Sequence, residues 1–480
     1  MVIAVDVGTS SARASAYADD GRPVPGLHHQ VPYEPRVTAD GGVEYEPRAL
    51  LGAVATCLDA VCARAGRAGV HGVAVTTFWH GLCGFDASGD PITPVYMWAD
   101  SRSARDAGLL RDALDETALH GRTGCHLHSS YWPAKLRWFA REHPGEMRRV
   151  ARWGSFGEHL ETTIFGDAAT SVSMASATGL FDVTTGTWDA EALAAAGIEP
   201  RQLFRVVDRD HERHGLRREW AGRWPALHAT PWFPAIGDGA ASNVGSDCIA
   251  GDRIALNVGT SAALRVATDG TQRPPRGLWR YAVDRRHLLL GGATSEGGNV
   301  YAWCRDTLQL PDDATLERRL QTMSPDAHGL TILPFLAGER APGWRGERRG
   351  IVAGLSLSTG PLEIVHAALE AVALRLALVY RLLAPYAARQ HAVVASGGAV
   401  THSRAWTRIL ADALGQPVTW SHEAEATSRG AALLAWQALG VVRDLASVRA
   451  PLGETFEPDP ARHARYREAL DRQRALDERV

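Results

Sequence analysis

Gly237-Asp238-Gly239 places a carboxylate between two glycines at the start of a run of small residues. A carboxylate in such a position can approach a bound hydroxyl without steric obstruction and accept its proton during phosphoryl transfer. Asp238 is therefore a candidate general base. The alternative is that Asp238 only caps the helix that follows it, which is a common role for Asp.

A second stretch with suitable chemistry occurs twice, about half the chain apart. Asp6 precedes Val7-Gly8-Thr9-Ser10-Ser11 in the first copy, and Asn257 precedes Val258-Gly259-Thr260-Ser261 in the second. Each copy reads as a strand, a glycine-containing turn and a strand, and such a turn can point successive backbone N–H groups into one anion-binding concavity. A single copy would favour a plain hairpin turn. The repeat instead predicts two related domains whose turns bind the phosphates of one nucleotide from two sides.

The two copies differ in charge where the first strand ends. Asp6 is ionised at neutral pH and suits a hydrated Mg²⁺, whereas Asn257 adds no charge. The alternative for Asp6 is an ordinary aspartate at the end of a strand.

The elements around these residues alternate between strands and helices, which predicts α/β layering in both halves. Residues 70–75 read as a buried strand, Glu46 to Arg67 as an amphipathic helix, and Pro361 as the start of a long helix that ends near Pro385. A chain of 480 residues exceeds what one hydrophobic core usually fills, so two domains are expected, with a boundary around 245–255.

Composition excludes several classes of function. The net charge of −3 gives no electrostatic case for binding nucleic acid or a membrane surface. No apolar run is long enough to span a bilayer, and the first residues enter a strand pattern without a basic leader. The six cysteines show no ligand-like pairs and read as reduced thiols, so we expect a cytoplasmic protein.

Polar and aromatic residues in the first half predict a wall for a small hydroxylated ligand. They are Trp79, His80, Asp100, Tyr131 and Lys135. Asp100 could equally form an ion pair with Arg102 that braces a loop, and Lys135 could be a surface lysine at the head of its helix. Cys125-x-x-His128 resembles half of a metal site, but no second half with suitable spacing appears, so a metal is not favoured there.

Taken together, these motifs resemble the FGGY family of carbohydrate kinases over nearly the whole chain. The resemblance is carried by Asp6 to Ser11, Gly237-Asp238-Gly239, Asn257 to Ser261, Ser396-Gly397-Gly398-Ala399, Gly350-x-Val352-x-Gly354-Leu355 and Glu363-Ile364-x-x-Ala367-Ala368-Leu369-Glu370. It implies an α/β fold of two actin-like (ribonuclease H-like) domains, residues 1–248 and 249–480, with the catalytic cleft between them. Such a cleft is expected to close on its substrates and exclude water.

The resemblance also implies a role for each candidate residue. Asp238 would be the general base and would contact the substrate together with Trp79, His80, Asp100, Tyr131 and Lys135. Asp6 would hold Mg²⁺ through water. The phosphates of ATP would meet Thr9, Ser10, Ser11, Arg13, Gly259 and Thr260, and the adenosine would meet Gly298, Gly397 and Gly398. Arg13 could instead be a strand-face charge, and each of these three glycines alone is more often a helix-packing residue.

Within the family the chain is most similar to bacterial gluconate kinases, through Trp79-His80, Trp98-Ala99-Asp100, Thr123-Gly124-Cys125 and Gly297-Gly298-Asn299-Val300. The expected activity is therefore ATP-dependent phosphorylation of a sugar or sugar acid, foremost D-gluconate, with His80 and Lys135 as partners for its carboxylate. One alternative is a xylulose- or ribulose-type ketose kinase. Another is a non-catalytic ATP-binding switch, because actin-like folds also serve that purpose. A homodimer is an assembly that the sequence leaves open.

Overall fold

The structure, a computed structural model, describes residues 1–66, 69–270 and 272–480. Two β-sheets form its framework. The first has the strand order β14-β6-β1-β2-β3 and the second the order β17-β18-β16-β15-β21-β22-β23. The strands of the first sheet are β1 (Val2–Val7), β2 (Ser11–Tyr17), β3 (Pro23–Pro32), β6 (Gly72–Thr77) and β14 (Ile236–Gly237). Those of the second are β15 (Arg253–Val258), β16 (Ala262–Thr268), β17 (Trp279–Ala282), β18 (Leu288–Thr294), β21 (Ala392–Ser396), β22 (Val418–Ser421) and β23 (Leu452–Phe456).

The two sheets repeat one topology. In the first, β1 pairs antiparallel with β2 and parallel with β6, and β14 continues parallel to β6. In the second, β15 pairs antiparallel with β16 and parallel with β21, and β22 continues parallel to β21. The repeated hairpin in the sequence is thus the first hairpin of each sheet. The predicted α/β fold with two related domains is confirmed.

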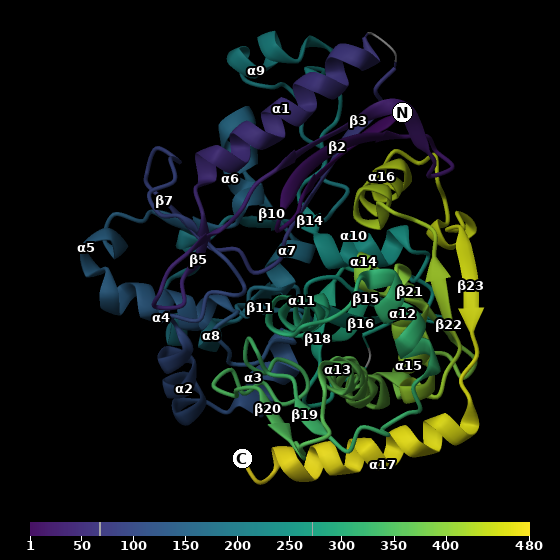
Figure 1. The fold of residues 1–480 in the computed structure, drawn as a ribbon. Helices are drawn as coiled ribbons and strands as arrows, with labels where there is room; N and C mark the ends of the chain where they lie inside the picture. Colours follow the sequence, from purple (N-terminus) through teal and green to yellow (C-terminus); the bar gives the residue numbers. More distant parts are fainter. Residues whose placement is uncertain (67–68, 271) are drawn as a thin grey trace.

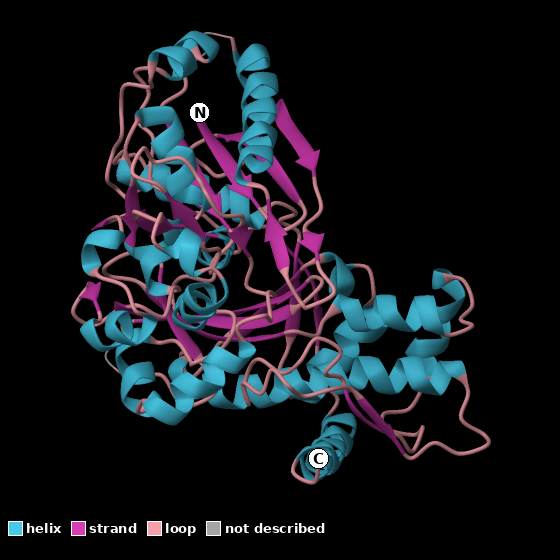
Figure 2. Cartoon of the chain, turned by 90° about the vertical axis from the view of Figure 1, so that its left-hand side faces the viewer, coloured by secondary structure: helices cyan, strands magenta, loops and turns pink. Residues whose placement is uncertain are grey.

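Helices cover the strands in both halves (Figure 2). In the first half they are α1 (Pro47–Ala65), α2 (Ala104–Ala113), α3 (Glu116–Thr123), α4 (Trp132–Glu142), α5 (Pro144–Met147), α6 (Phe156–Phe165), α7 (Val172–Ser176), α8 (Ala190–Ala196), α9 (Arg218–Arg223) and α10 (Asp238–Gly245). In the second half they are α11 (Gly298–Thr307), α12 (Asp313–Thr322), α13 (Pro361–Leu383), α14 (Gly398–Thr401), α15 (Arg404–Leu414), α16 (Ala426–Ala438) and α17 (Pro460–Asp477). The short outer strands are β4 (Arg36–Val37), β5 (Val43–Tyr45), β7 (Cys83–Phe85), β8 (Val95–Tyr96), β9 (Arg152–Gly154), β10 (Ala169–Ser171), β11 (Phe181–Asp182), β12 (Thr187–Trp188), β13 (Arg205–Val207), β19 (Thr331–Leu333) and β20 (Ile351–Ala353).

The predicted helices begin where their capping residues place them. The side chain of Glu46 accepts a hydrogen bond from the backbone N–H of Ala49 and starts α1, whose predicted last residue, Arg67, lies outside the described residues. Helix α13 has Pro361 in its first turn and ends at Leu383, two residues before Pro385, because proline cannot continue the hydrogen-bond ladder.

Helices α10 and α16 connect the two halves and lie between the two sheets (Figure 1). They cross so closely that glycine is required on both. A Cβ on Gly245 would lie 1.7 Å from the carbonyl oxygen of Ala426, and one on Gly430 would lie 1.9 Å from that of Ala241. Because α10 begins with Asp238, this crossing fixes the candidate base relative to the second domain.

Predictions from the sequence also concerned membrane spans, cysteines and domain limits. No described helix is long and apolar enough to cross a membrane. All six cysteines are free thiols, and five of them are buried. We retain 1–248 and 249–480 as the proposed domain limits, since the last strand of the first sheet ends at Gly237 and the first strand of the second sheet begins at Arg253.

Candidate active site

Asp238 lies at the edge of the first sheet where three parallel strands end. The register places Asp6 of β1 beside Thr76 of β6, and Thr76 beside Ile236 of β14, so the strand ends carrying Asp6 and Asp238 converge. The N-cap of α10 is Gly237, and Asp238 is the first helical residue. Asp238 therefore does not occupy the N-cap position, although its carboxylate accepts a hydrogen bond from the first-turn N–H of Gly239 at 2.7 Å.

Burial raises the pKa of Asp238 above its ordinary value, while Arg265 and the N–H groups of Gly239 and Trp79 oppose the rise. A carboxylate with a raised pKa that remains next to a cation is suited to accept a proton from a hydroxyl.

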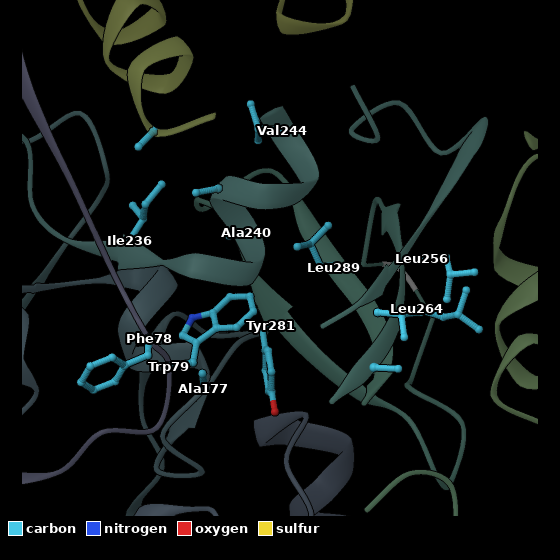
Figure 3. Packing of buried hydrophobic residues seen from close by; sticks show 14 of the residues in the cluster. Phe78, Trp79, Ala177, Ile236, Ala240, Val244, Leu256, Leu264, Tyr281 and Leu289 are labelled. Atoms are coloured by element: carbon cyan, nitrogen blue, oxygen red, sulfur yellow. The ribbon is translucent and has the colours of Figure 1, made fainter. Parts of the chain in front are cut away.

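The glycines on either side of Asp238 make room for Trp79. A Cβ on Gly237 would lie 1.8 Å from Nε1 of Trp79, and a Cβ on Gly239 would lie 2.3 Å from its ring. The indole N–H donates to the carbonyl of Ser173 at 3.1 Å. Figure 3 shows the indole beneath the start of α10, between Phe78 and Tyr281. The glycines therefore serve the packing of the predicted ligand wall as well as access to Asp238. We call this wall the sugar wall, and its predicted members are Trp79, His80, Asp100, Tyr131 and Lys135.

His80 continues the same wall. It is buried, and its backbone has a φ of 68°, which is uncommon for a residue other than glycine. Its Nδ1–H donates to the carbonyl of Ala177 at 2.6 Å, and burial lowers its pKa well below the ordinary value. A neutral imidazole with a protonated Nδ1 presents Nε2 as an acceptor. In this tautomer the ring suits a substrate hydroxyl, and the pairing of His80 with a substrate carboxylate stays a prediction.

Two tyrosines, one from each half, close the wall. The hydroxyl groups of Tyr131 and Tyr281 lie 2.6 Å apart, and the ring of Tyr281 contacts both Trp79 and His80, at centroid distances of 5.0 and 5.5 Å. Tyr281 stacks on Trp279 at 4.0 Å. The sequence pointed to Tyr131 but not to Tyr281, whose strand β17 carries no motif.

Lys135 and Asp100 are the two remaining residues that were predicted to contact the substrate. Lys135 is buried rather than on the surface, and its ammonium donates to the carbonyls of Ser129 at 2.9 Å and Ser130 at 2.5 Å. Burial lowers its pKa to about 7, while Asp100 raises it. Asp100 forms the ion pair with Arg102 that was its alternative role, with an N–O distance of 2.5 Å.

Two arginines near Asp238 were not singled out from the sequence. Arg265 on β16 has its Nε and Nη1 buried without a hydrogen-bond partner, and Arg340 has its Nε in the same state. Neither forms an ion pair with any described residue. Arg265 acts electrostatically on Asp238, and Arg340 acts on Arg265. An arginine within a strand as apolar as Ala262–Thr268 was the available signal for Arg265.

The first hairpin turn presents Asp6 and two hydroxyl residues. The N–H of Gly8 donates to the carbonyl of Ser11 at 3.0 Å, and Thr9 and Ser10 are exposed at the tip. Ser11 is buried, and its hydroxyl accepts a hydrogen bond from Gln30 at 2.9 Å. Thr9 and Ser10 are thus free to meet a phosphate, whereas Ser11 also holds the hairpin to β3.

Asp6 has the arrangement expected of a ligand to a hydrated cation. Its Oδ2 accepts from Arg13 at 3.1 Å, but its Oδ1 is buried without a partner. Burial raises the pKa of Asp6 to about 7, and Asp238 and Glu425 add to the rise. A divalent cation near Oδ1 would offset this concentration of carboxylates, so the donor set fits Mg²⁺.

The second hairpin turn is surrounded by close backbone contacts. The N–H of Gly298 donates to the carbonyl of Gly259 at 2.7 Å, and a Cβ on Gly298 would lie 2.7 Å from that oxygen. Gly397 has a φ of 95°, and its Cβ would lie 2.4 Å from the carbonyl of Val258. Gly398 follows at the start of α14, and Thr260 is exposed at the tip of the turn. The structure therefore brings together all five residues predicted for this side of the nucleotide.

A separate cluster contains three residues of types that can bind a metal ion. His328, His366 and Glu370 place their ligand atoms within 4.8 Å of one another. The N–H of Leu330 donates to Nδ1 of His328, so Nε2 of that ring carries the proton and donates to Glu370 at 2.8 Å. Tyr466 donates to the other oxygen of Glu370. These bonds join α13 to α17, which is a structural role.

Comparison with known proteins places this geometry in a family. Residues 1–245 match the N-terminal domain of the FGGY family of carbohydrate kinases, and residues 254–439 match its C-terminal domain. A gluconokinase of Bacillus subtilis is 27% identical over 472 residues, which cover 96% of this chain and 91% of that protein.

Solved structures give the same result. A ligand-bound xylulose kinase from Lactobacillus acidophilus superposes with a TM-score of 0.92 at 25% identity, over 99% of this chain and 97% of the other. A gluconate kinase from the same organism superposes with a TM-score of 0.91 at 25% identity and the same coverage.

Proposed function

Because the chain belongs to the FGGY family of carbohydrate kinases, we propose that it transfers the terminal phosphoryl group of ATP to D-gluconate, giving 6-phosphogluconate. Family membership makes the chain a phosphotransferase with an alcohol group as acceptor, and not a non-catalytic switch. The substrate within that class is our proposal. It is supported by the likeness to gluconokinases and by the charge of the site.

The excess of positive charge beside Asp238 is the observation that favours an acidic sugar. Arg265 is half-buried and Arg340 is buried, and neither arginine forms an ion pair within 4.0 Å of a carboxylate of the described residues. A buried cation without a counter-charge costs several kcal/mol, of order 3–5, and a bound anion offsets that cost. A neutral ketose would leave these cations unpaired.

In the reaction that we propose, Asp238 accepts the proton of the substrate hydroxyl. The hydroxyl oxygen forms a bond to the terminal phosphorus as the bond between that phosphorus and the ADP oxygen breaks. Trp79 and Tyr281 exclude water from one side of the acceptor, and Nε2 of His80 accepts a hydrogen bond from a second hydroxyl. Arg265 lies close enough to act on Asp238 and opposes the raising of its pKa, which favours the ionised form of the base.

The nucleotide would bind between the two hairpin turns. Thr9, Ser10 and Arg13 from the first turn, and Gly259 and Thr260 from the second, would contact the phosphates. The backbone around Gly298, Gly397 and Gly398 would accommodate the adenosine, since side chains are absent there. Asp6 would hold Mg²⁺, which when bound neutralises phosphate charge.

A ketose acceptor is the alternative, because a xylulose kinase superposes as well as a gluconate kinase does. An ADP-release assay decides between them. The panel contains D-gluconate, D-xylulose, D-ribulose, glycerol and a sample without acceptor, each with the wild type and with Asp238→Asn. Turnover that requires gluconate and is lost in the variant supports the proposal. Turnover on a ketose alone rejects gluconate but retains the proposed base.

A further inference from the structure

Arg340 is a buried cation from the second domain whose side chain packs against Trp98 of the first domain. Only 7% of its surface is exposed. Its guanidinium lies over the ring of Trp98, 4.9 Å from the centroid, and 5.9 Å from that of Trp344. It acts electrostatically on His80, His128 and Lys135, all of the first domain. The guanidinium therefore lies between Trp98 of the first domain and Trp344 of its own domain.

The carboxylates near Arg340 are already paired with other arginines. Asp100 pairs with Arg102, and the neighbouring Glu339 pairs with Arg345 at 2.6 Å and with Arg375. No carboxylate oxygen of a described residue lies within salt-bridge distance of Arg340, and its Nε has no hydrogen-bond partner. A buried arginine without an anionic partner has an unfavourable free energy, and a bound anionic ligand would offset that cost.

A second unused donor belongs to His128, whose ring, like the Arg340 guanidinium, contacts Trp344. His128 accepts the N–H of Ser130 at its Nδ1, at 3.1 Å, so its Nε2 carries the proton. That Nε2 is buried and has no partner. The ring packs against Trp344, at a centroid distance of 5.5 Å. Arg340 and His128 together thus offer charged and neutral donors without an acceptor of their own.

We infer that Arg340, assisted by the Nε2–H of His128, binds the carboxylate of the acidic acceptor and selects it over neutral polyols and ketoses. The guanidinium matches a carboxylate in two parallel hydrogen bonds, which a lone ammonium cannot. A six-carbon sugar acid carries its carboxylate and its terminal hydroxyl at opposite ends of the chain, so in this inference Arg340 holds one end and Asp238 meets the other. The inference rests on the proposed function.

The contact also couples recognition to domain position. Arg340 belongs to the second domain, whereas His80, His128 and Lys135 belong to the first. A carboxylate held by Arg340 while the rest of the acceptor lies on the first domain bridges the two. The ATP phosphates are the other anion available, but the rings beside Arg340 are those of Trp98 and Trp344, and neither belongs to the second hairpin turn.

The test compares D-gluconate with D-glucitol, the same six-carbon chain without a carboxylate, at saturating ATP. For the wild type we expect a higher kcat/KM on gluconate. For Arg340→Gln we expect the ratio of kcat/KM on gluconate to that on glucitol to fall about 100-fold, mainly through the KM for gluconate. Arg340→Lys should recover part of the ratio, since it retains charge but not the paired geometry. Arg105→Gln, which removes an exposed arginine of α2, is the matched control and should leave the ratio unchanged.

The outcomes separate this inference from the proposed function. A ratio that stays constant in both Arg340 variants, while thermal melts show folded protein, rejects Arg340 as the carboxylate ligand but leaves a gluconate kinase in place. A rise in the KM for ATP without a change in the ratio assigns Arg340 to the nucleotide and also rejects the inference. Wild-type protein without gluconate turnover rejects the proposed function itself. If Arg340→Gln does not fold, Arg340→Lys and His128→Ala carry the comparison.

Discussion

Gly237 and Trp79 occupy one space: the Cβ that Gly237 lacks would lie 1.8 Å from Nε1 of the indole. The glycine before the candidate base therefore determines where the largest side chain of the sugar wall lies. The wall and the base cannot be altered independently.

We expect Gly237→Ala to displace the indole and lower kcat/KM about 100-fold, because a shift of about 1 Å near the reacting atoms costs that much. Steady-state ADP release and tryptophan fluorescence measure the two effects. Gly108→Ala is the matched control: a Cβ on this glycine of α2 meets nothing within 4 Å, so activity should not change. Normal activity in Gly237→Ala would contradict the predicted steric conflict.

Removing the charge of Asp238 tests the base. Asp238→Asn is nearly isosteric, so the acceptor should still bind, while kcat should fall by a factor of about 10² to 10⁴. Turnover from an ADP-release assay and gluconate affinity from calorimetry separate the two quantities. A variant that keeps more than a tenth of the wild-type kcat would show that another group takes the proton.

The pH dependence of the reaction should report the raised pKa of Asp238. The ionised carboxylate is the active form, so kcat/KM should fall as the pH decreases through this pKa. Since burial raises the pKa above 3.8, the acid limb should lie at a higher pH than for an unperturbed Asp. A rate profile between pH 3 and 9 measures it, and an acid limb at or below 3.8 is incompatible with this assignment.

Glu161 should make the free energy of unfolding depend on pH. Its carboxyl accepts the N–H of Ala169 at 3.1 Å, and burial raises its pKa from 4.5 to about 8. The folded chain thus holds a proton that the unfolded chain releases. The resulting stabilisation is fully present below pH 4.5 and is lost as the pH rises to about 8, by up to about 1.4 kcal/mol per pH unit.

Glu161→Gln should therefore reduce the decrease in stability between pH 6 and pH 9, as measured by urea unfolding. The corresponding change at an exposed position, Glu34→Gln, is the control and should leave the slope as in the wild type. Identical slopes in the wild type and Glu161→Gln would mean that the Glu161 carboxyl is not held protonated.

The crossing of α10 and α16 predicts a loss of stability in Gly430→Ala. The added Cβ would lie 1.9 Å from the carbonyl oxygen of Ala241, so the helices must separate, at a cost of about 1–3 kcal/mol. Thermal denaturation measures the loss, with Gly108→Ala again as the control. Because α10 carries Asp238, kcat should fall as well, and a stable, fully active variant would contradict this account of the crossing.

The sequence alone determined the framework and part of the site. The repeated turns at Gly8 and Gly259 predicted two domains of one topology because strand and turn patterns are local. Asp238, His80 and Tyr131 were identified because each lies beside a strand end or helix start that a short motif marks. The glycines predicted to contact the nucleotide were identified for the same reason.

Only the tertiary structure decided which charged groups of the candidate site are buried and which are paired. The tautomer of His80 depends on the carbonyl of Ala177, which lies nearly a hundred residues away along the chain. Lys135 proved buried because the 129–130 backbone folds over its ammonium. Arg265 and Arg340 carry no local motif, and their lack of partners depends on which carboxylates the fold brings near them. Pairing and desolvation of charged groups are properties of three-dimensional neighbours, which residue spacing along the chain does not specify.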